Sequence, residues 1–196
     1  CLLGERVRYD GGHKGHSYIR RTLGEYFDFQ PFCPEVNIGL GIPRKPIRLW
    51  RNEKKKIRCV SVSDSNLDFT EQLKDCGDAQ HDWHKHLCGY ILKKDSPSCG
   101  MERVKIWDDV MPKREGVGVY ADKLIKNFPY LPIEEEGRLG DAVLRENFIQ
   151  RVFAMHRWFK FVSEGLSVGQ LADFHARHKL ILMSHDQTSY RELGQL

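Results

Sequence analysis

Residues 89–104, GYILKKDSPSCGMERV, place a cysteine in a Ser-Pro-Ser-Cys-Gly turn directly after the apolar run 90–92. The apolar run is typical of a short buried strand, and the polar turn residues mark where that strand ends. Two serines, a proline, a thiol and a glycine rarely occur together at such a point. Cys99 is therefore a candidate for core packing, a disulfide, a nucleophile or a metal ligand.

Short apolar runs and helical patterns alternate on both sides of this turn. Residues 57–62 (IRCVSV) are rich in β-branched side chains and predict a strand. The apolar spacing in residues 67–87 and 117–128 predicts helices. Strands that alternate with helices indicate an α/β domain, and we expect it to be built on a mostly parallel, open sheet.

The character of the chain changes after residues 132–137, PIEEEG, which we interpret as a linker. Asp141 can cap a following helix, and Ser167 with Gln170 has the spacing of a capping box. We therefore predict an α/β catalytic domain over residues 1–133 and a small all-helical domain over residues 138–196.

Both ends of the chain have patterns typical of incomplete domains. The helical piece is short for an independent core, so we expect it to be truncated. Residues 1–4, CLLG, have the pattern of a strand end followed by a tight turn. We accordingly expect a strand upstream of Cys1 that this sequence lacks.

Composition narrows the class of protein. With 40% hydrophobic and 11% aromatic residues the 196-residue chain can bury a core. No apolar run approaches the roughly 20 residues of a membrane helix, and we expect a cytoplasmic protein with no membrane partner. The net charge is +4, and residues 44–56 concentrate seven cations against one acid. Such a cluster suits phosphate contacts, and it equally suits a plain solvated loop.

The six cysteines lack any Cys-x-x-Cys pair, which favours reduced thiols over disulfides. Cys1, Cys33 and Cys99 share a setting, because each belongs to a turn-rich loop that follows an apolar run or, for Cys1, the expected missing strand. Ligands bind at the carboxyl ends of parallel strands, where three such loops can converge. Three thiolates suit zinc with a histidine, or an iron–sulfur cluster with one open iron. The other cysteines, at positions 59, 76 and 88, are predicted to fill the core.

Histidines offer a competing metal pattern. His81, His84 and His86 lie in HDWHKH, and His175 and His178 lie in FHARHKL. Both segments contain an i, i+3 pair, but no cysteine or carboxylate stands at a recognisable offset from either. We therefore interpret both as polar faces of helices.

Four segments carry a family resemblance. CLLGERVRYDGGHK, PFCPEVNIGLGIPRKPIRL, LKKDSPSCGMERVKIWDD and GVGVYADKLIKNFPYLPIEEEGRL occur in this order. Together they resemble the thiouridine desulfurase (TudS) family, and most closely its two-domain RudS-type tRNA 4-thiouridine desulfidases. RENFIQRVFAMHRW and ADFHARHKLILMSH resemble the YbgA-related helical domain of those members.

The resemblance implies a 4Fe–4S cluster held by Cys1, Cys33 and Cys99. It also implies removal of sulfur from 4-thiouridine in tRNA to give uridine, without net redox change. Water attacks the thiocarbonyl carbon in this reaction while an open cluster iron takes the soft sulfur. Proton transfer falls to Glu35 and to Ser96 or Ser98. The competing interpretations are an ion pair between Glu35 and Arg44, and serines that only cap the turn.

The partner is expected to be tRNA or a thiolated uracil nucleoside, and the sequence leaves the oligomeric state open. Seven residues are predicted to contact substrate or RNA: Arg8, Asp10, Arg44, Arg48, Lys93, Arg177 and Lys179. Two alternatives remain at this point. One is a desulfurase of free thiouracil or thiouridine nucleoside, and the other is a non-catalytic, metal-bearing module for RNA binding or redox sensing.

Overall fold

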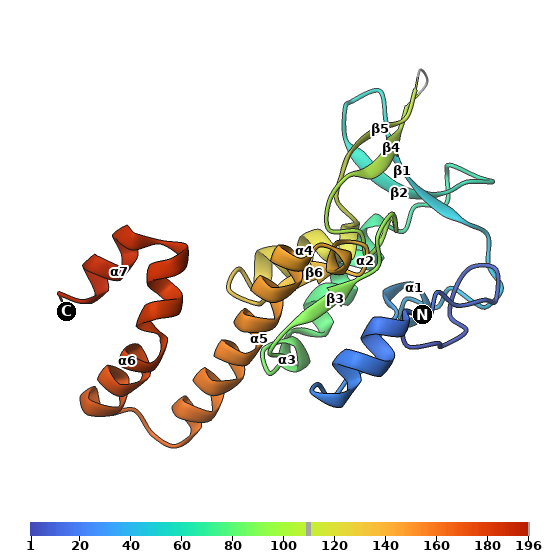
Figure 1. Ribbon diagram of the computed structural model, residues 1–196. Coiled ribbons are helices and arrows are strands. Elements are labelled where there is room, and N and C mark those ends of the chain that lie inside the picture. The colour runs from blue at the N-terminus through green and yellow to red at the C-terminus, as the bar shows by residue number, and fades with distance from the viewer. Residues whose placement is uncertain (109–110, 196) are drawn as a thin grey trace. The chain divides into compact units, whose positions relative to one another are not determined.

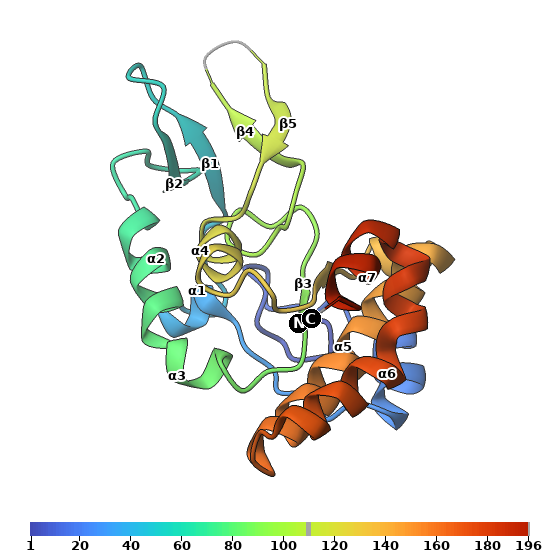
Figure 2. The ribbon, with the colours of Figure 1, turned by 90° about the vertical axis from the view of Figure 1, so that its left-hand side faces the viewer.

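The computed structural model describes residues 1–108 and 111–195 (Figures 1 and 2). Asp109, at the end of the motif that closes with WDD, and Leu196, the last residue of the predicted helical domain, lie outside the described residues. The chain forms two compact units, Cys1–Phe148 and Ile149–Leu196. The functional ranges 1–133 and 138–196 stay a prediction.

The first unit contains two small sheets. The four-stranded sheet has the order β2-β1-β4-β5, and a separate pair joins β3 to β6. The strands are β1 Ile47–Arg51, β2 Ile57–Ser61, β3 Tyr90–Leu92, β4 Val104–Trp107, β5 Lys113–Gly116 and β6 Ile133–Glu135.

The α/β class is confirmed, but the strand pairing is mixed where we expected it to be mostly parallel. The β1–β4 and β3–β6 pairs are parallel, whereas β1–β2 and β4–β5 are antiparallel. The reason lies in the connections. Only short segments join β1 to β2 and β4 to β5, and parallel neighbours need a long crossover.

Helices cover one face of the four-stranded sheet. Leu49, Cys59 and Ile106 of the sheet pack with Leu73 and Val119, which come from two different helices. The helices of this unit are α1 Pro34–Asn37, α2 Thr70–Ala79, α3 His81–His84 and α4 Val119–Asn127, with shorter turns at Tyr18–Thr22, Leu23–Glu25 and Arg138–Gly140. The predicted helix over 67–87 is thus divided into α2 and α3.

The acidic segment that we interpreted as a linker is a buried strand. Residues 133–135 form β6 against β3, and Glu134, Glu135 and Glu136 are only 6%, 2% and 9% exposed. Consecutive carboxylates in a sequence favour a solvated loop. Glu134 is paired with Arg138, four residues further along the chain. Glu135 and Glu136 are held by groups of the distant residues 93–101.

The second unit is helical. Helix α5, Ala142–Ser163, begins in the first unit and ends in the second, and α6, Val168–His185, and α7, Gln187–Leu193, follow. The capping box of Ser167 and Gln170 is confirmed, and Asp141 caps α5 by accepting from two backbone N–H groups. Among the described helices, none combines the length and apolar character needed to span a membrane.

Candidate functional site

The cysteine loop, residues 93–101, follows β3 and holds its turn by local hydrogen bonds. The Gly100 N–H donates to the Ser96 carbonyl at 2.8 Å, and the Cys99 N–H donates to Ser96 Oγ at 3.2 Å. Gly118 approaches the loop so closely that a Cβ there would lie 2.6 Å from the Ser98 carbonyl oxygen. Ser96 therefore caps the turn, as one of the two interpretations predicted, and Gly118 allows the neighbouring chain to pass.

Two buried glutamates hold the two ends of the cysteine loop. Glu136 accepts a hydrogen bond from the Lys94 N–H at 2.6 Å and pairs with the ammonium group of Lys93. Glu135 accepts from the Met101 N–H, also at 2.6 Å. Burial raises the pKa of Glu135, while backbone N–H donors counteract that rise. Because charged acceptors form the stronger hydrogen bonds, this arrangement fixes the loop to the end of β6.

A chain of hydrogen bonds runs from α1 into the loop. Glu35 Oε1 accepts from Ser98 Oγ at 2.6 Å, and Ser98 Oγ lies 3.0 Å from Ser96 Oγ. The other carboxylate oxygen of Glu35 accepts from Arg44 Nη2 at 2.8 Å and from Nε at 3.0 Å. Glu35 thus combines the predicted ion pair with a contact to a fully buried serine. Glu35, Ser98 and Ser96 form one continuous path along which a proton can move, and Arg44 fixes the carboxylate at its end.

The thiols of Cys33 and Cys99 lie beside this path. Cys33 is the N-cap residue of α1, two positions before Glu35, and the Cys99 Sγ lies 3.5 Å from Ser98 Oγ. Burial lowers the pKa of the amino group of Cys1, and the charges of the Cys33 and Cys99 thiols act in the opposite direction. All three residues are half-buried and free of disulfides. The structure therefore brings the three predicted cysteines to one place, although no strand directly precedes Cys33 in the described chain.

The site is not arranged around a single metal ion. Within residues 1–108 and 111–195, no three His, Cys, Asp or Glu side chains are positioned to share one ion. Burial, with the charges of Glu35 and Cys33, raises the pKa of the Cys99 thiol. A polynuclear centre binds its thiolates through several metal atoms and so separates them further than one ion does.

A family model described as 2-thiouracil desulfurase matches residues 1–136 of the chain. This chain belongs to the 2-thiouracil desulfurase family. The region of the match includes all three cysteines, Glu35, both serines of the loop and the two glutamates that hold it. The resemblance inferred from the sequence motifs is therefore confirmed.

Similar proteins extend the comparison. A solved structure of the [4Fe-4S]-dependent thiouracil desulfidase TudS matches with a TM-score of 0.56 and 29% identity, covering 75% of this chain and 93% of that one. The protein YbbK of Bacillus subtilis is 29% identical over 140 residues, 69% of this chain and 91% of its own length. YbgA of Escherichia coli is 43% identical over 44 residues, 22% of this chain. That match spans about a quarter of YbgA, 26% of its length.

The remaining cysteines of this desulfurase-family chain are part of the scaffold. Cys59 and Cys76 are 0% and 5% exposed and belong to the two hydrophobic clusters, as predicted. Cys88 is half-buried and belongs to neither cluster, so the core position predicted for it is not confirmed. Burial raises the thiol pKa of all three.

One histidine prediction is wrong. His84 does not belong to a polar helix face, because it is 1% exposed and its Nε2 lies 2.7 Å from the Tyr120 hydroxyl. Desolvation lowers the pKa of His84 to about 4. The spacing in HDWHKH places Trp83 and His84 side by side, and contacts from α4 and β3, distant in sequence, decide which ring enters the core.

The residues predicted to contact substrate or RNA occupy different settings. Arg44 and Lys93 are engaged in the ion pairs of the site, and Arg8 pairs with Asp10 at 3.4 Å. Arg48 lies on the four-stranded sheet with its guanidinium over the ring of Trp50. Arg177 and Lys179 are exposed on α6 of the second unit. Their contacts with RNA stay a prediction.

Proposed function

We propose that this chain is a [4Fe–4S]-dependent desulfidase that removes sulfur from 4-thiouridine in tRNA and leaves uridine. The observation that carries the proposal is the path Glu35–Ser98–Ser96 beside three free thiols, in a member of the 2-thiouracil desulfurase family. The cation-rich residues 44–56 support an RNA substrate. We place the reaction in the cytoplasm, where thiols stay reduced.

The donor set fits the cofactor of the solved relative. Cys1, Cys33 and Cys99 would hold the cluster, because thiolates are the ligands that iron–sulfur clusters use. Burial favours the neutral thiol of Cys99, so binding of the cluster would have to release the proton of this thiol. With three protein ligands, the bound cluster supplies a soft Lewis acid for the thiocarbonyl sulfur.

The side chains of the path would move the protons of the reaction. Water replaces sulfur at C4, so the C=S group becomes C=O and the sulfur leaves as hydrogen sulfide, with no change in electron count. Glu35 Oε1 takes a proton from the attacking water, and the hydroxyls of Ser98 and Ser96 relay a proton to the departing sulfur, so that both protons of the water end on hydrogen sulfide. Arg44 binds the other oxygen of Glu35 and so keeps Oε1 directed at Ser98. Proton transfer of this kind contributes roughly 10²–10⁴-fold in rate.

The test is an anaerobic sulfide-release assay with the reconstituted full chain. We expect sulfide and uridine in equal amounts from 4-thiouridine tRNA, faster than from the nucleoside, with a rate that falls as salt rises. A protein that shows cluster absorption but releases no sulfide from either substrate would contradict the proposal.

A second candidate is a desulfurase of free thiouracil or its nucleoside. It is favoured by the solved relative, which is a thiouracil desulfidase. In the same assay it requires equal rates on nucleoside and tRNA, and no dependence on salt.

A further inference from the structure

The four-stranded sheet has a second face, away from the helices, that carries cations and tryptophans. Leu49 and Ile106 are paired in the register of β1 and β4 and point into the core. Because successive side chains of a strand alternate, their neighbours emerge on the opposite face. These neighbours are Arg48 and Trp50 on β1, and Lys105 and Trp107 on β4, with Trp50 opposite Trp107 in the register.

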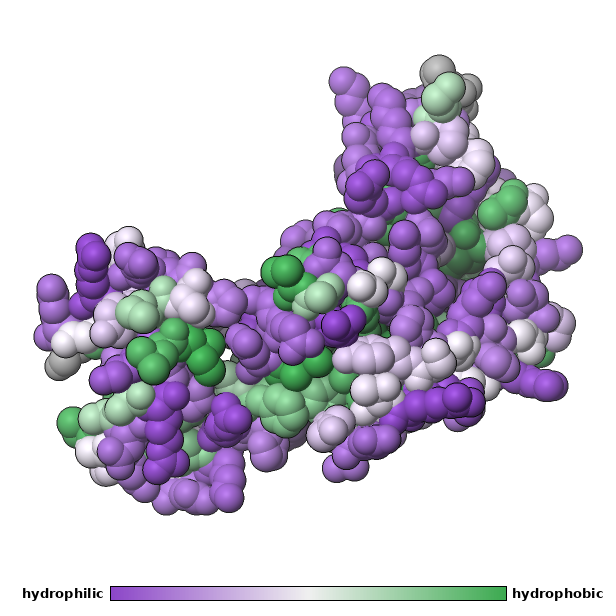
Figure 3. All heavy atoms as spheres, viewed as in Figure 1, coloured by the Kyte–Doolittle hydropathy of each residue, from purple (hydrophilic) through white to green (hydrophobic). Residues whose placement is uncertain are grey.

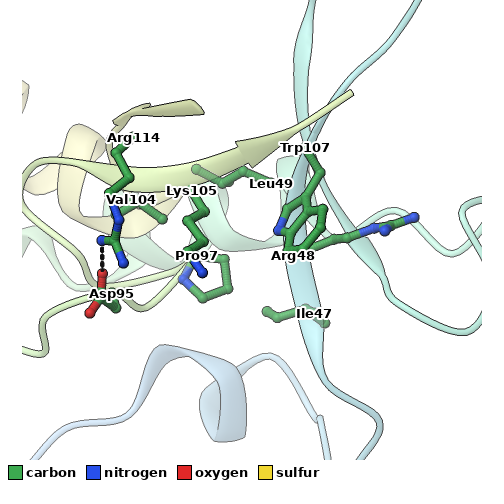
Figure 4. A pocket seen from close by; sticks show the side chains of 9 residues that line it. All are labelled: Ile47, Arg48, Leu49, Asp95, Pro97, Val104, Lys105, Trp107 and Arg114. Carbon is green, nitrogen blue, oxygen red and sulfur yellow. Dashed lines mark hydrogen bonds and ion pairs between the residues drawn. The ribbon is translucent and has the colours of Figure 1, made fainter. Parts of the chain in front are cut away.

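This face contains a pocket of about 260 Å³ that adjoins the cysteine loop (Figure 4). Its walls come from three strands and from the loop itself. The polar and aromatic lining residues are Arg48, Lys105, Trp107, Arg114 and Asp95, and Pro97 closes the side toward the loop. Pro97 stands in the chain between Ser96 and Ser98, so the pocket and the proton path share one short segment.

The pocket has an excess of positive charge. Asp95 is paired with Arg114 at 2.7 Å, which neutralises one of the three cations. Neither Arg48 nor Lys105 forms an ion pair with a carboxylate of the described residues; the ion pairs of this sheet include those of Arg51 and Arg114. The Nε–H of Arg48 is buried and has no hydrogen-bond partner among residues 1–108 and 111–195, and its guanidinium extends away from Pro97 and Lys105 in Figure 4. Lys105 thus leaves a positive charge in the pocket that an anionic ligand can pair with.

Aromatic surface accompanies the charge. The Arg48 guanidinium lies 4.6 Å from the ring centre of Trp50 and 5.9 Å from that of Trp107. Trp107 is 36% exposed, which leaves part of its ring open for stacking. Figure 3 shows mainly hydrophilic side chains over the strands at this end of the first unit. Cations for a phosphate beside a ring for a base match the requirements of a nucleotide.

We propose that this pocket binds one nucleotide of single-stranded RNA, a neighbour of the nucleotide that enters the reactive site. The inference rests on the proposed function. The described lining includes Asp95 and Pro97 but not Ser96, Ser98 or Cys99. A base that reacts beside Ser98 therefore does not fill the pocket, and the phosphodiester chain would bring the phosphate of the adjacent nucleotide to Lys105. The base of that nucleotide stacks on Trp107.

The test measures binding of a labelled, unmodified, uridine-rich single-stranded oligonucleotide to the full chain by fluorescence anisotropy. We expect Lys105→Ala and Trp107→Ala each to weaken binding roughly tenfold, since a phosphate contact and a stacked base are lost. Lys105→Ala should also lower the salt slope by about one. Lys126→Ala is the matched control, because this exposed lysine lies on α4 and does not line the pocket.

Two results would overturn the inference. The first is affinity of the Lys105 and Trp107 variants that equals that of the Lys126 variant. The second is competition by uridine 5′-monophosphate as strong as that of the oligonucleotide at equal phosphate concentration, which would assign the pocket to a free nucleotide. Unmodified RNA contains no sulfur to remove, so binding is scored apart from catalysis. Sulfide release from 4-thiouridine nucleoside by the same variants tests the proposed function separately.

Discussion

The cysteine loop and the aromatic cluster of His84, Tyr90 and Tyr120 both contain buried polar side chains of the first unit. They differ in their hydrogen-bond partners. At the loop, Glu35 of α1 accepts a hydrogen bond from Ser98, and Ser98 lies within hydrogen-bond distance of Ser96, beside half-buried thiols. In the aromatic cluster, Tyr120 lies 2.7 Å from His84 Nε2 and 3.3 Å from the Tyr90 hydroxyl, while His84 Nδ1 has no partner.

Burial shifts the pKa of each group in the aromatic cluster in the direction that favours its neutral form. It lowers the pKa of His84 to about 4 and raises those of Tyr90 and Tyr120 above their usual range. Burial thus keeps the groups of the aromatic cluster neutral, whereas at the cysteine loop the Glu35 carboxylate is paired with Arg44. We therefore expect substitutions in the loop to reduce activity more than stability, and substitutions in the cluster to do the reverse.

The largest effect on activity is expected for Cys99→Ala. Removal of this thiol should reduce sulfide release to background and abolish cluster absorption, because a ligand is lost, while thermal unfolding changes little. Cys59→Ala is the matched control. Cys59 is fully buried in the core, so its loss should cost about 1 kcal/mol of stability and leave the reaction intact. Full activity of Cys99→Ala would show that Cys99 is not a cluster ligand and is, like Cys59, dispensable for the reaction.

Glu35→Gln keeps the size of the side chain and removes its capacity to accept a proton. Sulfide release should fall by roughly 10²–10⁴-fold, measured at constant cluster content. Glu71→Gln is the control, since this side chain is 77% exposed on α2. A loss of less than tenfold would show that Glu35 serves mainly as the ion-pair partner of Arg44.

The aromatic cluster should reveal itself in the pH dependence of stability. Below pH 6.5 the histidine of the unfolded chain takes a proton, while His84 in the folded chain stays neutral down to about pH 4. Stability should therefore fall as the pH drops through this window, by about 3 kcal/mol in total. Urea denaturation at several pH values measures it. His84→Gln should remove this contribution, and an unchanged pH profile in that variant would contradict the assignment.

A smaller effect on stability and activity is expected for Glu136, which holds the cysteine loop to the end of β6. Glu136→Gln retains an acceptor for the Lys94 N–H but removes the charge that pairs with Lys93. We expect a loss of about 1 kcal/mol in the free energy of unfolding, and a decrease in sulfide release well below that of Glu35→Gln. Glu71→Gln, which breaks the exposed pair with Lys74, should stay within about 0.5 kcal/mol. Equal losses of unfolding free energy in the two variants would mean that the ion pair between Glu136 and Lys93 adds nothing to stability.

Local sequence patterns predicted the parts of this molecule whose signals are local. The apolar run before the Ser-Pro-Ser-Cys-Gly turn predicted β3, and the Ser-x-x-Gln spacing predicted the cap of α6. The shared settings of Cys1, Cys33 and Cys99 indicated a common site, which stays a prediction.

The rest depended on partners that lie far away in the chain. Glu135 and Glu136 are buried because Met101, Lys93 and Lys94 reach them from residues 93–101, and no pattern within residues 132–137 contains that information. His84 is in the core because Tyr120 of α4 meets its ring. In both cases tertiary contacts override a local preference for solvent.

The close approach of Gly118 to the loop limits how this site can be transplanted. A Cβ at position 118 would lie 2.6 Å from the Ser98 carbonyl carbon and 2.7 Å from the Cys99 nitrogen. A designer who grafts residues 93–101 onto another scaffold must therefore graft the glycine-led start of α4 with them. The portable unit is a pair of segments, and exchange of the loop alone would displace the thiol that it presents.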